Sequence, residues 1–258
     1  MVEKKNGLND LQAYQKYLRI LKSEKCSELS LKAIPKRKRT NGSRELYNIA
    51  YDDYHGLKKV DWRAPTEEEQ KTAFEYMSKR GFSSKTLNKV KAKVTYNPSY
   101  EIMFPMLDNG KFRGWVCRTT VPEIENKRKY LYNEGFSRAS TLVGEYGSVD
   151  YVIVVEGYMD RLKFIQFGVE NVVAILGWKM SAQQIEKLKS KGITKIISAL
   201  DNDVCGKRGT EYLKGFFNVT RFRYLKGIKD PGEMTKETFD RMYNKTMSDF
   251  RRKYNGID

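Results

Sequence analysis

The stretch Tyr151-Val152-Ile153-Val154-Val155-Glu156-Gly157-Tyr158-Met159-Asp160 decides the fold that we expect for this chain. Its apolar first half, residues 151–155, is typical of a short buried strand, and Glu156 stands where that strand ends. Gly157 permits a sharp exit, and residues 161–167 then have the composition of a helix. The stretch therefore predicts a strand that delivers a carboxylate to the edge of a sheet.

The same pattern of a strand followed by a helix recurs downstream. Residues 172–176 and 193–200 read as two more apolar strands, with a helix over residues 182–191 between them. This βαβαβ order predicts parallel strands, whose carboxyl ends lie at one edge of the sheet. The last strand ends in Asp201-Asn202-Asp203, and the i, i+2 spacing places both aspartates on one face if the chain stays extended. We expect them to meet Glu156 at that edge.

A further acidic residue, Asp230, lies in Lys229-Asp230-Pro231-Gly232-Glu233 and follows an expected strand over residues 219–225. Carboxylates gathered at one edge repel one another, and their pKa values rise unless a cation neutralises them. Mg²⁺ or Mn²⁺ suits such a site, because hard divalent ions prefer oxygen ligands. Helix caps and solvated strand ends are the alternative for an isolated Asp-x-Asp, but the repeated strand context favours a metal site.

These motifs together resemble the Toprim domain of DnaG-type bacterial primases. The resemblance covers roughly residues 149–235 and is carried by Glu156 to Asp160, Leu176-Gly177, Asp201 to Asp203 with Gly206, and Lys229-Asp230-Pro231. Upstream, residues 103–106 with Gly114 and Arg118, then residues 129–133, resemble the amino-terminal half of the primase RNA-polymerase core. The resemblance implies an α/β fold with a central, mostly parallel sheet flanked by helices, preceded by a smaller α+β subdomain.

The family's residue roles can be carried over by position. The resemblance implies metal binding by Glu156, Asp160, Asp201, Asp203 and Asp230, with Glu156, Asp201 and Asp203 as catalytic residues, and binding of nucleotide or template by Arg118, Lys129, Asn133 and Lys229. The implied reaction is attack of a 3′-hydroxyl on the α-phosphate of a ribonucleoside triphosphate, assisted by two ions. The chain departs from the family at Trp178, Cys205 and Gly232, and Glu233 is the candidate to replace the carboxylate missing at Gly232.

The domain organisation follows from the resemblance and from composition. We expect a basic arm over residues 1–64, a primase core subdomain over 65–148, the Toprim domain over 149–235 and a C-terminal helix over 236–258. Expected helices outside the Toprim segment are 8–21, 66–80 with Thr66 as N-cap, 84–91 and 235–258, the last burying Phe239, Met242, Met247 and Phe250. A basic stretch over residues 35–42 is interpreted either as a contact to a DNA backbone or as a solvated loop.

Composition favours a nucleic-acid partner independently of any family. The chain has 49 Lys and Arg against 32 Asp and Glu, a net charge of +17, which attracts phosphodiester backbones. Aromatic residues make up 12% of the chain and could stack on the bases of single-stranded DNA. The abundance of Lys, Asn and Tyr suggests an AT-rich genome such as that of a phage.

The chain has three cysteines and one histidine, which limits the metal sites and disulfides that it can form. Cys26, Cys117, Cys205 and His55 are too dispersed for a tetrahedral zinc ribbon, so we expect no zinc and a separate zinc-binding protein for template recognition. The odd cysteine count indicates a reducing compartment, and no apolar run approaches a membrane span, so we expect a cytoplasmic location and no membrane partner. Without a GxxxxGK[ST] loop, any helicase would be a separate partner.

Two other functions would use the same carboxylates or the same basic surface. A metal-dependent Toprim nuclease would employ water as the nucleophile, but the segment with Arg118 and Lys129 favours a triphosphate pocket instead. A catalytically inactive Toprim protein would serve as a nucleic-acid-binding adaptor in a replication complex. The sequence favours a primase core that makes short RNA primers on single-stranded DNA.

Overall fold

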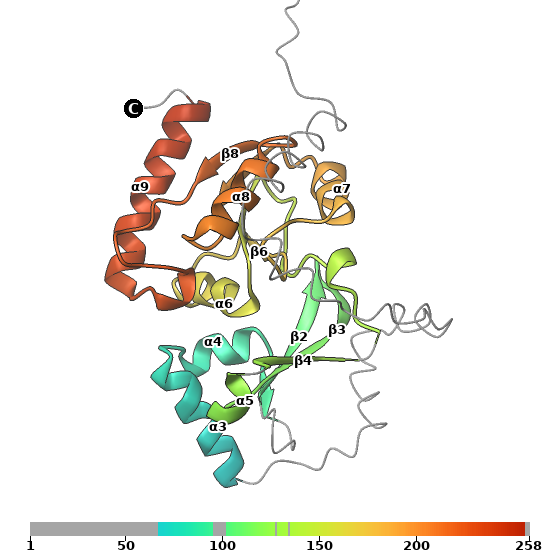
Figure 1. Cartoon of the computed structure of the whole chain (residues 1–258), viewed down its shortest axis with the longest axis vertical. Helices are drawn as coiled ribbons and strands as arrows, with labels where there is room; N and C mark the ends of the chain where they lie inside the picture. Colours follow the sequence, from blue (N-terminus) through green and yellow to red (C-terminus); the bar gives the residue numbers. More distant parts are fainter. Residues whose placement is uncertain (1–66, 95–101, 127, 134, 256–258) are drawn as a thin grey trace, which may run out of the picture.

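The computed structural model describes residues 67–94, 102–126, 128–133 and 135–255 (Figure 1). The basic arm 1–64, the expected helix 8–21, the basic stretch 35–42 and the expected cap Thr66 lie outside these residues. Within the described ranges, none of the helices has the length and apolar composition that crossing a membrane requires.

The first part of the structure is an antiparallel sheet with helices beside it. Its strand order is β1-β2-β3-β4, and the bounds are β1 Lys93–Val94, β2 Ile102–Asp108, β3 Lys111–Arg118 and β4 Tyr130–Tyr132. Helices α3 (Glu67–Lys79), α4 (Ser84–Lys89) and the short α5 (Pro122–Glu125) accompany it (Figure 1). The helices expected over 66–80 and 84–91 are therefore present with slightly shorter bounds.

The second part is the parallel sheet that the sequence predicts. Its order is β6-β5-β7-β8, all neighbours being parallel, with bounds β5 Tyr151–Val155, β6 Val172–Ala174, β7 Lys195–Ser198 and β8 Asn218–Arg221. Its helices are α6 Tyr158–Gln166, α7 Ala182–Ser190, α8 Val204–Leu213 and α9 Lys236–Asn255, and a 3₁₀ turn, η4, spans Arg138–Ser140. The α/β class with a parallel sheet flanked by helices is confirmed.

Alternation along β5 divides the core between the two faces of this sheet. Ile153 and Val155 pack in one cluster with residues of α6 and α9, whereas Val152 and Val154 pack in another with residues of α7 and α8. The residues expected on the buried side of the last helix are all buried: Phe239, Met242, Met247 and Phe250. Each face of the central strand is thus covered, as a near-continuous apolar strand requires.

Three expected strands are too long: β6 ends at Ala174 and not at residue 176, β7 covers 195–198 and not 193–200, and the third difference affects the site. The sequence predicts a strand over residues 219–225, but β8 ends at Arg221. Phe222 N still donates to Ser198 O of β7 at 2.9 Å, but the chain then turns away from the sheet, and Arg223 N donates to Thr246 Oγ1 of α9 at 2.9 Å. Asp230 therefore follows an irregular segment, and the expectation that it directly leaves a strand end is wrong.

The two parts share one core and several polar contacts. A single cluster of buried side chains includes Met77, Phe82 and Phe104 of the first part and Leu162 and Phe164 of α6. Lys163 Nζ also donates to Arg80 O at 2.9 Å, and Ser83 N donates to Gln166 Oε1 at 3.1 Å. The antiparallel sheet is thereby fixed against helix α6, which starts at the acidic end of β5.

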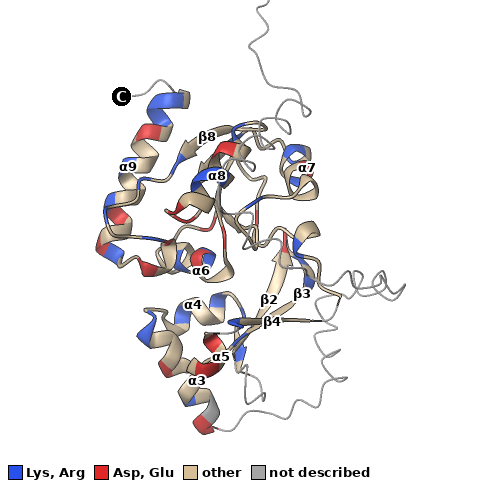
Figure 2. Cartoon of the chain, in the orientation of Figure 1, with Lys and Arg blue, Asp and Glu red and all other residues tan. Residues whose placement is uncertain are grey.

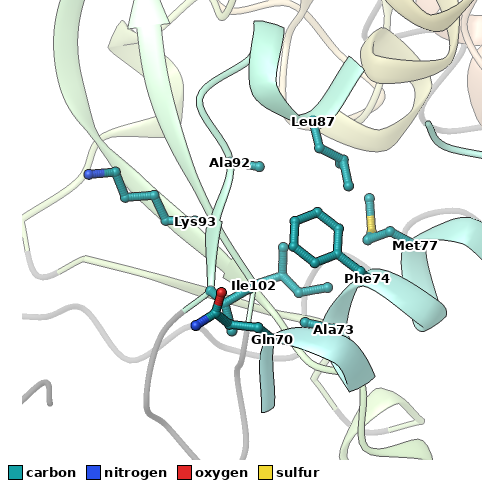
Figure 3. A pocket seen from close by; sticks show the side chains of 9 residues that line it. Gln70, Ala73, Phe74, Met77, Leu87, Ala92, Lys93 and Ile102 are labelled. Atoms are coloured by element: carbon teal, nitrogen blue, oxygen red, sulfur yellow. The ribbon is translucent and has the colours of Figure 1, made fainter. Parts of the chain in front are cut away.

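A pocket of about 290 Å³ lies between α3, α4 and the edge of the antiparallel sheet (Figure 3). Phe74 lines it and is 40% exposed, and Met77, Leu87 and Ile102 contribute further apolar surface. All its described lining residues come from the span 70–102, and they include no carboxylate. This pocket is separate from the acidic residues of the parallel sheet, where the chemistry is expected.

Candidate active site

The first acidic loop follows β5. Glu156 comes directly after the strand, and Gly157 is the N-cap of α6. Gly157 N donates to Asp160 Oδ2 at 2.8 Å, so the Asp160 carboxylate folds back over the start of its own helix. Helix α6 begins at Tyr158, earlier than the sequence predicts, because this cap stabilises its first turn.

The second acidic loop follows β7, which lies beside β5. Asp201 N donates to Glu156 Oε1 at 3.3 Å, so the two loops are in direct contact. Since β6 and β7 lie on opposite sides of β5, this contact is at the point where the strand order reverses, the usual location of sites in open α/β sheets. Asp203 is the N-cap of α8, and its Oδ1 accepts a hydrogen bond from Gly206 N at 2.8 Å.

Gly206 is required for the close packing of this loop. An ideal Cβ on Gly206 would lie 2.0 Å from the backbone oxygen of Asp201, which no side chain tolerates. The start of α8 therefore lies directly against the backbone that carries Asp201. The glycine three residues after Asp203, part of the resemblance motif, has a structural reason at this site.

The third acidic loop contains Asp230, the N-cap of a 3₁₀ turn, η5 (Pro231–Glu233). Asp230 Oδ1 accepts from Glu233 N at 3.2 Å, and an ideal Cβ on Gly232 would lie 3.5 Å from Asp160 Oδ1. A backbone hydrogen bond from Gly232 to the Asp160 carboxylate closes this contact. Asp230 therefore joins Asp160 although it does not directly follow a strand.

Lys229 and Glu233 frame the third loop. Lys229 N donates to Glu233 Oε2 at 2.8 Å, and both residues are exposed. Glu233 thus lies beside the acidic cluster, and its charge contributes to raising the pKa of Asp201. The side chain of Lys229 is exposed, and its predicted contact to a nucleotide stays a prediction.

Electrostatics set these carboxyl groups apart. Burial, the nearby charge of Asp201 and smaller effects of Asp203 and Asp160 raise the pKa of Glu156 to about 8. Burial, then Asp201 and Asp230, raise the pKa of Asp160 to about 7, and burial with Asp230, Asp203 and Glu233 raises that of Asp201 to about 6. Such shifts indicate carboxylates held together without a neutralising charge.

The donor set fits a hard divalent cation. Asp201 Oδ1 is buried and has no hydrogen-bond partner among the described residues, and carboxylate oxygens are the ligands that Mg²⁺ and Mn²⁺ prefer. In the described part of the chain, however, no three Asp, Glu, His or Cys side chains are already arranged to hold an ion. Asp160, Asp203 and Asp230 each use a carboxylate oxygen as a helix or turn cap, which fixes these side chains at the starts of α6, α8 and η5.

The basic residues predicted to bind nucleotide lie in the other sheet. Arg118 is only 2% exposed; its Nη2 donates to Tyr76 Oη at 2.8 Å, it forms an ion pair with Glu125, and its guanidinium lies 4.9 Å from the centre of the Tyr130 ring. Its charge is therefore satisfied within the chain. Lys129, in contrast, is exposed.

Asn133 also has a partner inside the chain. Its Oδ1 accepts from Trp115 N at 2.7 Å, which links the end of β4 to the middle of β3. The structure therefore brings the predicted acidic residues to one edge and leaves Arg118 and Asn133 in intramolecular contacts of the antiparallel sheet.

Sequence reasoning missed residues that hold the acidic loops in place. Tyr224 Oη donates to Ala199 O at 2.9 Å, and its pKa is raised by burial and by Asp160 and Asp201, which places its ring beside the cluster. Arg221 Nη2 donates a hydrogen bond to Asn202 Oδ1 at 2.8 Å. In the sequence, Tyr224 is one aromatic residue of an expected strand, and no local pattern distinguishes it.

Comparisons with known proteins agree with this geometry. The family described as Toprim-like matches residues 153–235. A Mycoplasma genitalium protein, uncharacterized protein MG010, is 31% identical over 158 residues, which are 58% of this chain and 71% of that protein. The DNA primase of Clostridium acetobutylicum is 29% identical over 219 residues, covering 75% of this chain.

A solved DnaG primase catalytic domain bound to single-stranded DNA has a similar fold, with a TM-score of 0.57, 19% identity and coverage of 85% of this chain and 86% of that one. The chain belongs to the DnaG-type primase family and carries a Toprim domain. In this chain, the segment that matches the Toprim-like family lies inside residues 149–235, the segment expected from the motifs. The chain spans 34% of the length of the Clostridium primase.

Proposed function

We propose that this chain is a primase core that synthesises short RNA primers on single-stranded DNA by metal-assisted nucleotidyl transfer. The observation that carries the proposal is the meeting of Glu156, Asp160, Asp201 and Asp230 at one edge of the parallel sheet, with the pKa values of the first three raised. Its membership of the primase family supports the same reaction class.

The acidic residues would hold the metal ions. Glu156, Asp160, Asp201, Asp203 and Asp230 are the proposed ligands of Mg²⁺ or Mn²⁺, with Glu156, Asp201 and Asp203 nearest the reaction. When bound, such ions neutralise developing charge on the attacking and leaving oxygens. The chain itself contributes rigid placement: Asp201 and Glu156 are linked by a backbone hydrogen bond, and Asp203 is fixed as the cap of α8.

Basic side chains would receive the triphosphate and the template. Lys129 and Lys229 are exposed and are the proposed contacts for nucleotide. Arg118 would act by holding β3, β4 and α5 together, because its guanidinium already binds Tyr76 and Glu125. The net charge of +17 would attract single-stranded DNA, with affinity that falls steeply as salt rises.

The proposal extends to the surroundings of the core. Lys and Arg are spread over the helices of both parts (Figure 2), which favours contact with a DNA backbone over a broad surface. A cytoplasmic location, a separate replicative helicase and a separate zinc-binding protein for template recognition belong to this proposal. They follow from the resemblance and from the dispersed cysteines.

The direct test is primer synthesis by the full chain. The purified protein is incubated with single-stranded DNA, Mg²⁺ or Mn²⁺ and labelled ribonucleoside triphosphates. Short labelled products are expected from the unaltered chain and from Glu237→Ala, which removes the same charge from an exposed position of α9. Asp201→Ala should make none, because it removes a proposed metal ligand.

Other outcomes would overturn the proposal in distinct ways. Degraded template without labelled products would indicate a metal-dependent nuclease that uses the same carboxylates. Salt-sensitive DNA binding without any reaction, in the presence of either ion, would indicate an adaptor. Equal product from the unaltered chain and Asp201→Ala would place the chemistry elsewhere in the chain.

A further inference from the structure

Asn202, which lies between the two aspartates of the second acidic loop, forms hydrogen bonds with two other segments of the chain. Its side-chain Nδ2 donates to Ile228 O at 3.1 Å, and its backbone N donates to Lys229 O at 2.6 Å. Its Oδ1 accepts from Arg221 Nη2 at 2.8 Å. One residue thereby connects the loop after β7 with the segment that leads into Asp230.

The anchor of this arrangement is rigid. Arg221 is the last residue of β8 and pairs with Ser198, the last residue of β7. Its guanidinium therefore extends from a fixed strand end to Asn202, and through Asn202 to the irregular segment that contains Ile228. The segment that contains Ile228 lies beyond the end of β8, so the hydrogen bonds of the sheet do not hold it in place. The bonds to Asn202 do.

Asn202 joins two loops that carry like charges. Asp201 and Asp203 flank it in one loop, and Asp230 follows its partners Ile228 and Lys229 in the other, so the carboxylates repel each other across the connection. The hydrogen bonds from Asn202 to Ile228 O and Lys229 O hold the loops together, and the Arg221 guanidinium binds the amide oxygen of Asn202. Asn, with one acceptor and two donors, can satisfy Arg221 and Ile228 at the same time.

We propose that Asn202, held by Arg221, is a positioning residue that sets the separation of the Asp201, Asp203 and Asp230 carboxylates before a divalent ion binds. The inference rests on the proposed function, since it assigns these carboxylates to metal. It predicts that Asn202 affects affinity for the ion more than fold stability. Asn202 itself is not a ligand in this proposal, because both of its side-chain polar atoms are already engaged.

The test is the affinity of the full chain for Mn²⁺, measured by electron paramagnetic resonance in the absence of DNA and nucleotide. Asn202→Ala should weaken Mn²⁺ binding about 10-fold or more, the usual result of removing an outer partner of metal ligands. Arg221→Met should also weaken Mn²⁺ binding. The double variant should lose less affinity than the product of the two separate fold-losses, because both changes break the same series of hydrogen bonds. Asn218→Ala, an exposed asparagine at the opposite end of β8, is the matched control and should bind Mn²⁺ normally.

Hydrogen exchange gives a second reading that does not depend on the ion. In metal-free protein, peptides spanning residues 200–206 and 226–233 should exchange faster in Asn202→Ala and Arg221→Met than in the unaltered chain. Exchange in α7, remote from both loops, should be the same. If Asn202→Ala does not fold, Arg221→Met still tests the proposal, because it removes only the bond to Asn202 Oδ1.

The outcomes separate this inference from the function on which it rests. Mn²⁺ binding by the unaltered chain that both variants retain in full would overturn the positioning role alone. Absence of Mn²⁺ binding and of primer synthesis in the unaltered chain would overturn the proposed function and this inference with it. Weakened Mn²⁺ binding accompanied by an equal loss of α7 protection would also overturn the inference, because it would show general unfolding.

Discussion

The two sheets of this protein treat charged side chains in opposite ways. In the antiparallel part, buried Asp108 accepts from Tyr146 Oη at 2.7 Å and forms an ion pair with Lys187. Buried Arg118 is likewise paired, with Glu125. At the acidic edge of the parallel sheet, Asp201 Oδ1 is buried without a hydrogen-bond partner among the described residues, and the pKa of Glu156 is raised to about 8.

This difference separates structural charge from functional charge. A buried charge that is paired within the chain holds segments together, and its removal leaves the partner uncompensated. Like charges that are gathered without a counter-charge cost folding free energy, which a ligand of opposite sign recovers. The comparison therefore predicts that neutralising a charge stabilises one region and destabilises the other.

The largest expected effect is on catalysis by Glu156→Gln. The variant keeps the acceptor for Asp201 N but loses the charge proposed to hold metal. Primer synthesis should fall about 100-fold or more, which corresponds to about 3 kcal/mol of transition-state stabilisation. At pH 8 and without metal, its thermal unfolding temperature should exceed that of the unaltered chain, because one of the repelling charges is gone.

Glu186→Gln provides the control for that variant, since Glu186 is exposed on α7. Both its activity and its unfolding temperature should match those of the unaltered chain. Should Glu156→Gln lose activity and stability together, the carboxylate would be a structural group, and the contrast between the two sheets would fail.

The next largest effect is on stability, and it concerns Arg118→Met. The change leaves Glu125, whose side chain is 26% exposed, with only the guanidinium of Arg80 at 3.8 Å, and it removes the donor to Tyr76. We expect a loss of about 2–4 kcal/mol in the free energy of unfolding, measured by urea denaturation. Lys111→Met, an exposed change in the same strand, should alter stability by less than about 0.5 kcal/mol.

The same experiment decides the role of Arg118 in the reaction. Unchanged stability combined with a raised KM for nucleotide would make Arg118 a ligand, as the family resemblance implies. Loss of stability with a normal KM at temperatures where the variant remains folded would make it a structural residue of the antiparallel sheet.

A smaller effect is expected from pH in the metal-free protein. The pKa values of Glu156 and Asp160, about 8 and about 7, exceed those of unfolded carboxyl groups, about 4. The folded state therefore binds more protons than the unfolded state between these limits, and these groups lower stability as pH rises from about 4 to about 8. For a chain of this size, each 1 kcal/mol lowers the unfolding temperature by about 2–4 °C.

Calorimetry at pH 5.5 and pH 8, with and without Mg²⁺, measures this effect. Because the ion binds the charged carboxylates, it should raise the unfolding temperature more at pH 8 than at pH 5.5. In Glu156→Gln, the metal-free unfolding temperature should fall less between pH 5.5 and pH 8 than it does in the unaltered chain. A metal-free stability that rises between pH 5.5 and pH 8, and is indifferent to Mg²⁺, would contradict the account of the acidic edge.

The sequence predicts local features of this molecule better than long-range ones. Strand β5, helix α7 and the buried side of α9 follow from apolar periodicity, which is encoded within a few residues. The acidic residues of the first two loops follow from strand order, because parallel strands place their carboxyl ends together.

What the sequence leaves open depends on partners that are distant in the chain. Tyr76, the partner of Arg118, is 42 residues away, and Arg221 is 19 residues from Asn202. The end of β8 at Arg221 depends on contacts with α6 and α9 that no local pattern in residues 219–225 reveals. Pairing of this kind decides which charged residues are free for function.

The smallest expected effect tests the exposed counterpart of Arg118. Lys129 is held by its backbone, since Thr119 N donates to Lys129 O at 3.3 Å, while its side chain is exposed. Lys129→Ala should therefore leave stability unchanged and raise the KM for nucleotide about 2- to 5-fold, as expected for an exposed charge contact of about 0.5–1 kcal/mol. An unchanged kcat would indicate a contact made equally in the ground state and the transition state. Lys111→Ala controls for the loss of one positive charge, and an equal rise in KM for both variants would assign the effect to the general basic field, leaving no specific role for Lys129.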